Sequence, residues 1–386
     1  MSGEVVYDPV ANPYAPGAGT PPPALVGRDT ELEAARVALA RLQARRSSQH
    51  LLVQGLRGVG KTVLLGAVSA LAESSGYTVL QLEGDIRGDA VSSVIRQTRR
   101  VLEDAQPSPK VRRALQVLKS VSVSLGVADV KVELERRIER DQAAAEDLAE
   151  LLVALASAVA DDDGGIALIV DEAQALPLPQ LGALLGALHA GAQRQLPIWG
   201  AMAGLPNLLS RTTKAKTYAE RMFLVAELGP LPEPSARAAL QNPAAELAVT
   251  FSDGALKKIL DRSAGYPYFL QTWGYHTWNV ARDDPISARD VTRAEPGVGR
   301  VLDEGFFAAR VARVPESERR YLRALASLGP GSHPSGAVAE ALGTTTSGVG
   351  ALRDRLITDG IIFSPTYGAV SFALPLLDDY LRRTGP

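Results

Sequence analysis

Residues 51–62 read L-L-V-Q-G-L-R-G-V-G-K-T, an apolar run that enters a glycine-rich turn and ends in lysine and threonine. From Gly55 onward the stretch fits the pattern G-x-x-x-x-G-K-[ST] of a phosphate-binding loop. Glycines at Gly55, Gly58 and Gly60 allow the backbone to wrap a polyphosphate with its N–H groups. Because an apolar strand pattern precedes the loop and a helical pattern follows it, we predict a strand–loop–helix unit that binds the phosphates of a nucleotide.

The loop also supplies the side chains that such chemistry needs. We expect Lys61 to reach the β- and γ-phosphates of ATP or ADP and the Thr62 hydroxyl to bind Mg²⁺. The predicted nucleotide contacts in this stretch are Gly55, Arg57, Gly58, Val59, Gly60, Lys61, Thr62 and Val63.

A second motif supports the first. Residues 166–170 read I-A-L-I-V, and Asp171 and Glu172 follow directly. A strand that is apolar on both faces is typical of the centre of a parallel sheet. An acidic pair at a strand end is often only the solvated start of a loop, but a phosphate loop in the same chain favours a catalytic role. We expect Asp171 to hold Mg²⁺ and Glu172 to polarise the attacking water.

Composition excludes several classes of protein. The chain has 386 residues, a formal net charge of −2 and no cysteine, so disulfide frameworks, thiolate zinc sites and cysteine nucleophiles are excluded. A chain this near neutrality is not globally basic, so any DNA binding must be local. The N-terminal residues lack an apolar segment, and the apolar run at 148–160 is too short to span a bilayer. We expect no membrane segment and a soluble, cytoplasmic protein.

The pattern of elements divides the chain into successive parts. Strands that alternate with helices predict an α/β fold, a P-loop NTPase with a parallel doubly wound sheet. The expected parts are a Pro/Gly-rich extended arm at 1–24, an ATPase core at 25–230, a helical lid at 231–300, and a linker helix with a winged helix at 301–386. Within the core, residues 85–142 look like an insertion. Residues 121–127 and 130–134 alternate with a period of two, which predicts a β-hairpin there.

The C-terminal pattern predicts a winged helix. Helices are expected at 316–328, 335–342 and 345–357, and strands at 361–363 and 370–373 flank a turn. The last of these helices would be the recognition helix, with Thr345, Thr346, Ser347, Arg353 and Arg355 as candidate contacts. Acidic residues balance the arginines of this segment, so DNA binding through 335–373 and binding of a protein partner both stay open.

Further short motifs carry a family resemblance. Residues 25–32, L-V-G-R-D-T-E-L, precede the phosphate loop, and residues 265–267 read G-Y-P. Together with the two nucleotide motifs, they make residues 20–386 resemble AAA+ ATPases, specifically bacterial AAA-family and STAND-like proteins related to origin-recognition ATPases. The resemblance implies an AAA+ sheet, a helical lid and a C-terminal winged helix. It also implies that Val26 and Arg28 cover the adenine and that Pro267 lies near the base.

The resemblance assigns a role to Arg221 as well. These proteins often carry an arginine before the fifth strand, and such a residue can act across a subunit boundary on the transferring phosphoryl group. A nucleotide-dependent homo-oligomer is therefore expected, with Arg221 in a catalytic role. The alternative is an exposed arginine at the start of a strand.

Two departures from the family pattern make slow hydrolysis the expectation. The strand at 197–203 does not end in the polar residue that usually senses the γ-phosphate, and only Asn207 could replace it. Tyr268 stands where origin-type relatives often have an arginine. The sequence thus leaves two hypotheses: an ATPase that couples its nucleotide state to DNA binding, or a STAND-like switch whose insertion and winged helix bind protein partners and drive oligomerisation.

Overall fold

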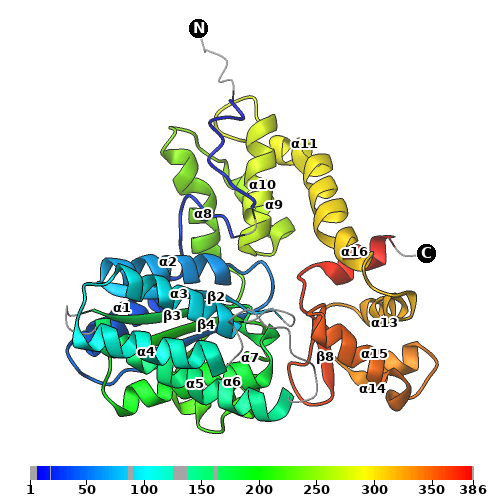
Figure 1. The fold of residues 1–386 in the computed structure, drawn as a ribbon. Helices are drawn as coiled ribbons and strands as arrows, with labels where there is room; N and C mark the ends of the chain where they lie inside the picture. Colours follow the sequence, from blue (N-terminus) through cyan, green and yellow to red (C-terminus); the bar gives the residue numbers. More distant parts are fainter. Residues whose placement is uncertain (1–6, 18, 86–89, 125–136, 160–163, 385–386) are drawn as a thin grey trace. The chain divides into compact units, whose positions relative to one another are not determined.

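The computed structural model describes residues 7–17, 19–85, 90–124, 137–159 and 164–384, shown in Figure 1. The chain forms two compact units. The sheet unit comprises Asp29–Gln54 and Leu64–Glu227, and the lid unit comprises Met1–Arg28, Gly55–Val63 and Leu228–Pro386.

A five-stranded sheet is the centre of the sheet unit. Its strands lie in the order β2-β3-β4-β1-β5, and the pairs β1–β4, β2–β3 and β3–β4 are parallel. The bounds are β1 His50–Gly55, β2 Tyr77–Glu83, β3 Gly165–Asp171, β4 Ile198–Gly204 and β5 Phe223–Leu228. This confirms the predicted α/β fold with a parallel sheet.

Helices connect the strands and bury the sheet. They are α1 Asp29–Gln43, α2 Lys61–Ser74, α3 Ala90–Asp104, α4 Pro109–Ser124, α5 Arg137–Val159, α6 Leu178–Gln193 and α7 Leu208–Ala215. Strand β3 is apolar at consecutive positions because both of its faces are buried. Ile166, Ala167 and Leu168, for example, are all buried. Helix α5 packs against α4 and α6.

The predicted hairpin is wrong over residues 121–124, which form the last turn of α4. Its remaining part, 125–134, lies outside the described residues. Val111, Ala114, Leu118 and Val121 are all buried and recur every three or four residues, so one helical face continues through the segment. Alternation over so few residues fits both periods, and burial of this face against α5 decides for the helix.

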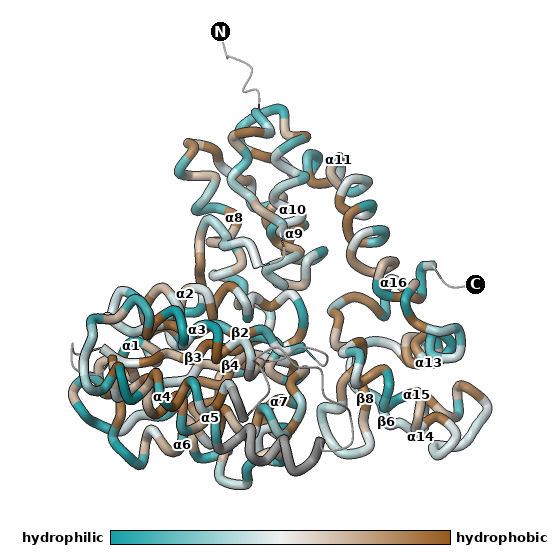
Figure 2. The backbone as a smooth tube through the Cα atoms, in the orientation of Figure 1, coloured by the Kyte–Doolittle hydropathy of each residue, from teal (hydrophilic) through white to brown (hydrophobic). Residues whose placement is uncertain are grey.

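The lid unit is mostly helical. After β5 come α8 Glu233–Ala245, α9 Asp253–Ser263, α10 Pro267–Val280, α11 Ala288–Gly299, a π-helical segment Arg300–Ala308, and the short α12 Ala309–Val311. Hydrophobic and hydrophilic residues alternate along α11 and the segment after it, as expected for helices with one face on a core (Figure 2).

The C-terminal part of this unit combines helices with a small sheet. Its elements are α13 Glu316–Ser327, β6 His333–Pro334, α14 Ser335–Ala341, α15 Thr346–Thr358, β7 Ile362–Phe363, β8 Ala369–Phe372 and α16 Leu377–Thr384. The strands are antiparallel in the order β6-β8-β7. The sequence patterns missed β6 and α16, because one is very short and the other is a single amphipathic pair of turns.

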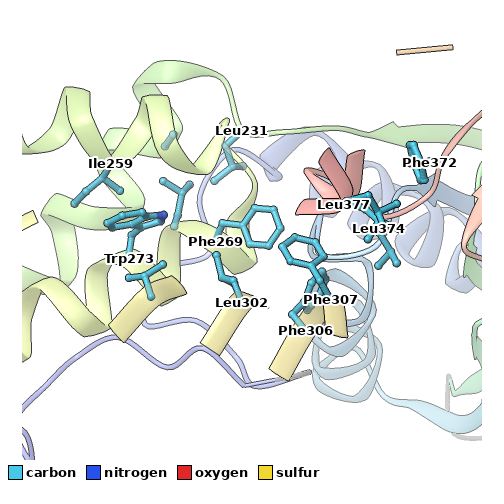
Figure 3. Packing of buried hydrophobic residues seen from close by; sticks show 14 of the residues in the cluster. Leu231, Ile259, Phe269, Trp273, Leu302, Phe306, Phe307, Phe372, Leu374 and Leu377 are labelled. Atoms are coloured by element: carbon cyan, nitrogen blue, oxygen red, sulfur yellow. The ribbon is translucent and has the colours of Figure 1, made fainter. Parts of the chain in front are cut away.

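An aromatic cluster joins the lid helices to the C-terminal part. Phe269 of α10 and Phe306 of the π-helical segment meet edge to face with centroids 5.6 Å apart, and Phe307 stacks on Tyr380 of α16 at 5.2 Å. Figure 3 shows Phe269, Phe306 and Phe307 projecting toward one another. Rings in these geometries add to the stabilisation that their burial provides.

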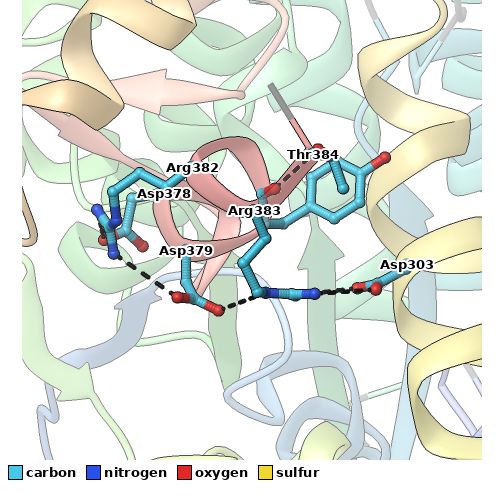
Figure 4. Close-up of polar contacts among 7 residues, drawn as sticks. Asp303, Asp378, Asp379, Arg382, Arg383 and Thr384 are labelled. Carbon is cyan, nitrogen blue, oxygen red and sulfur yellow. Dashed lines mark hydrogen bonds and ion pairs between the residues drawn. The ribbon is translucent and has the colours of Figure 1, made fainter. Parts of the chain in front are cut away.

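Charged residues also link the π-helical segment to α16. The Arg383 guanidinium contacts both Asp303 oxygens at 3.2 Å and the Asp379 carboxylate at 2.9 Å (Figure 4). Its pKa is raised, first by the hydrogen bond to Asp303. Since α16 is fixed through both its aromatic and its charged face, the lid helices and the C-terminal part belong to one compact unit.

The N-terminal arm packs along the lid. Its described residues 7–17 and 19–24 contain neither helix nor strand, as the proline content predicts. The Tyr14 hydroxyl donates to the Leu240 carbonyl at 2.5 Å, and Asn12 Nδ2 donates to the Tyr275 carbonyl at 2.9 Å. A Cβ on Gly274 of α10 would lie 2.8 Å from the Tyr14 ring, so glycine is needed there.

Tyr14→Ala should lower the free energy of unfolding by about 3 to 5 kcal/mol, because a large buried ring is removed and leaves a cavity. Tyr14→Phe should cost about 1 kcal/mol, the value of the hydroxyl hydrogen bond alone. Urea denaturation followed by tryptophan fluorescence measures both changes. Val10→Ala in the same arm is the control: Val10 is 92% exposed, and its replacement should leave stability unchanged. Equal stability of Tyr14→Ala and the parent protein would contradict the packing of the arm.

Candidate functional site

The phosphate loop adopts a backbone conformation that only glycine tolerates at several of its positions. Gly58 and Gly60 have φ of 81° and 92°, values that side-chain-bearing residues rarely adopt. A Cβ on Gly55 would lie 2.4 Å from the Leu228 carbonyl oxygen, so only glycine fits where the loop leaves β1. Each glycine of the motif therefore has a physical reason in this backbone.

Lys61 lies at the start of α2 and is buried, with 6% of its surface exposed. Its ammonium group donates to the carbonyls of Gly55 at 3.0 Å and Leu56 at 2.9 Å. The loop thus encloses a positive charge beside the positively polarised end of a helix. Thr62 is exposed on the first helical turn, and Val63 follows it half-buried. Residues of these types, in this arrangement, fit a polyphosphate with its cation.

Arg28 braces the loop from outside the motif. Its Nη2 donates to the Val59 carbonyl at 3.1 Å and to the Gly229 carbonyl at 3.0 Å, and the side chain is 7% exposed. Val59 itself is fully buried, and Val26 packs against the hydrophobic core of the lid unit. Bracing by the Arg28 side chain was not predicted. The contacts of Val26 and Arg28 with adenine remain predictions.

The G-Y-P motif brings the lid onto the loop. Gly265 has φ of 72°, and Pro267 begins α10 after Tyr266. Proline suits this first helical position because its missing N–H would have no helical partner. The next residue, Tyr268, donates its N–H to the Gly58 carbonyl at 3.3 Å. Contact of Pro267 with the base remains a prediction.

Arg57 links the loop to the C-terminal part of the lid unit. Its N–H donates to the Ala373 carbonyl at 3.2 Å, and its Nε donates to the Gly360 carbonyl at 3.4 Å. The motif pattern leaves this position free to vary, so it does not predict the contact. The loop is therefore held by both the lid helices and the C-terminal part.

The acidic pair lies at the end of β3 in the sheet unit. Asp171 is the last residue of the strand, and its Oδ1 accepts the N–H of Glu172 at 2.8 Å. Glu172 has φ of 45° and ψ of 34°, a left-handed conformation that is costly for a residue with a side chain. Strain of this kind concentrates at functional sites. Because β1, β3 and β4 are parallel, their carboxyl ends share one edge of the sheet, where ligands of open α/β sheets bind.

Comparison with known families agrees with this geometry. Residues 24–199 match the family model described as AAA ATPase domain. Together with the parallel sheet and the phosphate loop, this match supports a P-loop fold of the AAA+ ATPase type for these residues. Residues 304–381 match a second model, a domain of unknown function (DUF8462). No match was found among curated protein sequences.

The chain is also similar to solved structures. The Walker-type ATPase of Pyrococcus abyssi has a TM-score of 0.58 and 16% identity, covering 93% of this chain and 96% of that chain. The Holliday junction branch migration motor RuvB of Thermotoga maritima gives 0.46 and 16%, covering 93% and 96%. Cdc6p of Pyrobaculum aerophilum gives 0.46 and 14%, covering 97% of each chain. At these identities the first likeness shows a common fold.

Gln174 is a residue of the ATPase domain that the sequence did not reveal. Its Nε2 donates to Glu172 Oε2 at 2.5 Å, while its Oε1 accepts the Leu205 N–H at 3.1 Å. One amide thus connects the Glu172 carboxylate to the end of β4. A Cβ on Gly204 would lie 2.3 Å from Gln174 Oε1, so the glycine permits this approach. In the sequence, Gln174 is only a glutamine two residues after the acidic pair, and this spacing does not indicate a role until the fold is known.

Asn207 lies just beyond β4, at the N-cap of α7. Its Oδ1 is buried and accepts no hydrogen bond from the described residues. Such an atom is costly unless a further donor or a water binds it. Its position after the strand next to β3 agrees with the predicted sensing role, which remains a prediction.

Arg221 lies at the other edge of the sheet. It is exposed and ends a 3₁₀ turn just before β5, and the neighbouring Met222 carbonyl accepts the N–H of His50 at the start of β1. Strands of this length span about 20 Å. Arg221 therefore lies far from the acidic pair of its own sheet. Its action across a subunit boundary remains a prediction, and an exposed arginine at the start of a strand remains the alternative.

The described residues contain no group of three or more His, Asp or Glu side chains that could hold a metal ion by themselves. Mg²⁺ usually keeps several waters and takes one or two protein oxygens together with substrate phosphates. Binding of Mg²⁺ by Thr62 and Asp171 remains a prediction. In the same described ranges, no helix combines the length and hydrophobicity that a bilayer crossing needs.

Gln174→Ala should lower the rate of ATP hydrolysis about ten-fold and leave nucleotide affinity within about two-fold, because Glu172 loses the amide that orients it. Single-turnover hydrolysis and calorimetric titration measure the two quantities. Gln193→Ala, an exposed glutamine of the same domain, is the control. Unchanged hydrolysis in Gln174→Ala would show that the contact with Glu172 has no catalytic consequence.

Proposed function

We propose that the chain is a slow ATP-hydrolysing switch in which the nucleotide state of the phosphate loop controls the C-terminal part. The observation that carries this proposal is the pair of hydrogen bonds from Arg57 to Gly360 and Ala373. They join the loop that receives the phosphates directly to residues 304–381.

The proposed chemistry assigns one task to each residue. The loop N–H groups and Lys61 bind the phosphates, and Val26 and Pro267 contact the base. Thr62 and Asp171 bind Mg²⁺, which neutralises charge on the transferring phosphoryl group. Glu172, oriented by Gln174, accepts a proton from the attacking water.

Coupling follows from the loop itself. Phosphates recruit the loop N–H groups, so the loop backbone adjusts when the nucleotide binds or loses its γ-phosphate. The donors of Arg57 lie on that backbone and on its side chain. Hydrogen bonds of this kind contribute about 0.5 to 3 kcal/mol. That range overlaps the coupling energies typical of allosteric proteins, about 1 to 3 kcal/mol.

The same proposal treats residues 316–373 as a winged helix. Support comes from the order helix, strand, helix, helix, strand, strand and from the antiparallel pairing of the three strands. In this proposal α15 is the recognition helix. Its N-cap Thr345 and its first residues Thr346 and Ser347 are exposed, as a contacting surface must be.

The charges of this segment favour one of the two kinds of partner that the winged helix could bind. Arg355 contacts the buried Glu318 at 2.6 Å, and Arg353 contacts Asp354 at 3.0 Å. Both candidate arginines of the recognition helix are thus already paired with carboxylates. Tyr367, at the turn between β7 and β8, is fully exposed, and exposed tyrosines are common in protein interfaces. These features favour a protein partner, and DNA binding through 335–373 is the second candidate.

Assembly completes the proposal. Arg221 is exposed on the sheet edge away from its own acidic pair, which suits a homo-oligomer that forms with ATP bound. Hydrolysis would then require a neighbouring subunit to supply the guanidinium, and the rate would depend on protein concentration.

ATP hydrolysis should be measurable in the wild-type protein and abolished in Lys61→Ala and Glu172→Gln. Lys61→Ala should also lose nucleotide binding, whereas Glu172→Gln should bind ATP with normal affinity, since only the proton acceptor is lost. Phosphate release and calorimetric titration separate the two effects. ATP binding without any hydrolysis in the wild type would overturn the enzymatic part of the proposal.

The partner is tested by a salt titration of DNA binding with ATP and with ADP. A protein-binding winged helix should show no DNA affinity that falls steeply with salt or changes with the nucleotide. Nucleotide-dependent DNA binding that weakens in Thr345→Ala and Ser347→Ala would instead support the second candidate.

A further inference from the structure

The N-terminal arm runs along helix α10 toward the phosphate loop (Figure 1). Its contacts follow each other in opposite order along the arm and the helix. The paired positions are Tyr7 with Trp278, Asn12 with Tyr275, and Ala15 with Gln271. The arm thus leads to the first turn of α10, where the N–H of Tyr268 donates to the Gly58 carbonyl of the loop.

The chain then lies beside the loop at two points. A Cβ on Gly19 would lie 3.4 Å from Cγ2 of Thr62, so one methyl group would fill the space between this backbone and the Thr62 side chain. Further along, Arg28 donates to the Val59 carbonyl at 3.1 Å. Residues 19–28, which we call the strap, therefore begin and end beside the loop. A segment this short with both ends at the loop cannot extend far from a nucleotide bound there.

The arm is attached to the lid through side chains. In the described part of the arm, no backbone–backbone hydrogen bond joins it to α10. Asn12 Nδ2 instead donates to the Tyr275 carbonyl at 2.9 Å and to Asn279 Oδ1 at 2.8 Å. The Tyr14 hydroxyl donates to the Leu240 carbonyl at 2.5 Å. A segment held in this way can detach locally at a lower free energy than global unfolding requires.

We infer that the strap closes over the nucleotide and that detachment of the arm from α10 limits nucleotide exchange. The inference rests on the proposed nucleotide binding and adds the regulation of that site. While the arm is attached, α10 holds the loop at Gly58 and keeps the strap beside Thr62. Once the arm detaches, the strap moves away, and the nucleotide enters or leaves. Exchange is then slow, as a switch requires if its nucleotide state is to persist.

Asn12→Ala and Tyr14→Phe test the inference at positions away from the loop. Each variant loses hydrogen bonds that attach the arm, so the detached population should rise about three- to ten-fold. Stopped-flow fluorescence with N-methylanthraniloyl-ADP should show faster binding and faster release by this factor. The dissociation constant should change less than either rate, because a gate limits entry and exit alike. Loss of a contact with the nucleotide would speed release alone.

Val10→Ala is the matched control, because Val10 belongs to the same arm and is 92% exposed. Both of its rates should stay within about two-fold of the wild type. Thermal melting checks that each variant is folded, and Tyr14→Phe, the milder change, decides if Asn12→Ala fails to fold.

A cross-link tests the opposite direction. The chain has no cysteine, so Asn12→Cys/Asn279→Cys supplies its only two thiols. The native side chains at these positions contact each other at 2.8 Å, and a short bifunctional thiol reagent would keep the arm attached. N-methylanthraniloyl-ADP bound before the reaction should leave the linked protein about ten-fold more slowly than the unlinked variant. Asn279→Cys alone, treated with the same reagent, is the control.

The outcomes separate this inference from the proposed function. Unchanged rates in Asn12→Ala and Tyr14→Phe, faster release without faster binding, or equal release from the linked and unlinked proteins would overturn the inference. If the wild type nevertheless binds ATP and Lys61→Ala does not, the proposed nucleotide binding stands. If the wild type binds neither ATP nor ADP, both are wrong.

Discussion

The carbonyl groups of the phosphate loop are turned toward protein donors, and the proposed function depends on this constraint. Lys61 binds the carbonyls of Gly55 and Leu56, Tyr268 binds that of Gly58, and Arg28 binds that of Val59. Buried backbone oxygens need such partners. With its oxygens held in this way, the loop leaves its N–H groups available to an anion.

This constraint also explains why the loop belongs to the lid unit although a strand of the sheet unit leads into it. Its donors come from residues far apart in sequence, before α1, at the start of α10 and within the motif itself. Arg57 extends the set to Gly360 and Ala373. A change in the loop backbone therefore reaches the lid and the C-terminal part through hydrogen bonds, and no separate relay is required.

Local sequence was enough to predict the sheet, the loop and the Asp171–Glu172 pair, because their patterns reflect backbone geometry and burial within a few residues. It could not predict the contacts of Arg28 with the Val59 and Gly229 carbonyls or of Gln174 with the Leu205 N–H, because these partners lie at least 31 residues away in sequence. The predicted hairpin is wrong at residues 121–124 because a short alternating stretch fits a helix as well as a strand. Packing against α5 favours the helix.

In the proposed function, nucleotide bound at the phosphate loop changes the hydrogen bonds that link the loop to the C-terminal part. Amide hydrogen exchange of residues 361–373, measured with and without ATP, tests it most directly. The account predicts that ATP changes exchange in this segment in the wild type, that Lys61→Ala abolishes the change, and that Arg57→Ala removes it while ATP still binds. Saturating ATP that protects the loop yet leaves exchange at 361–373 unaltered would contradict the account.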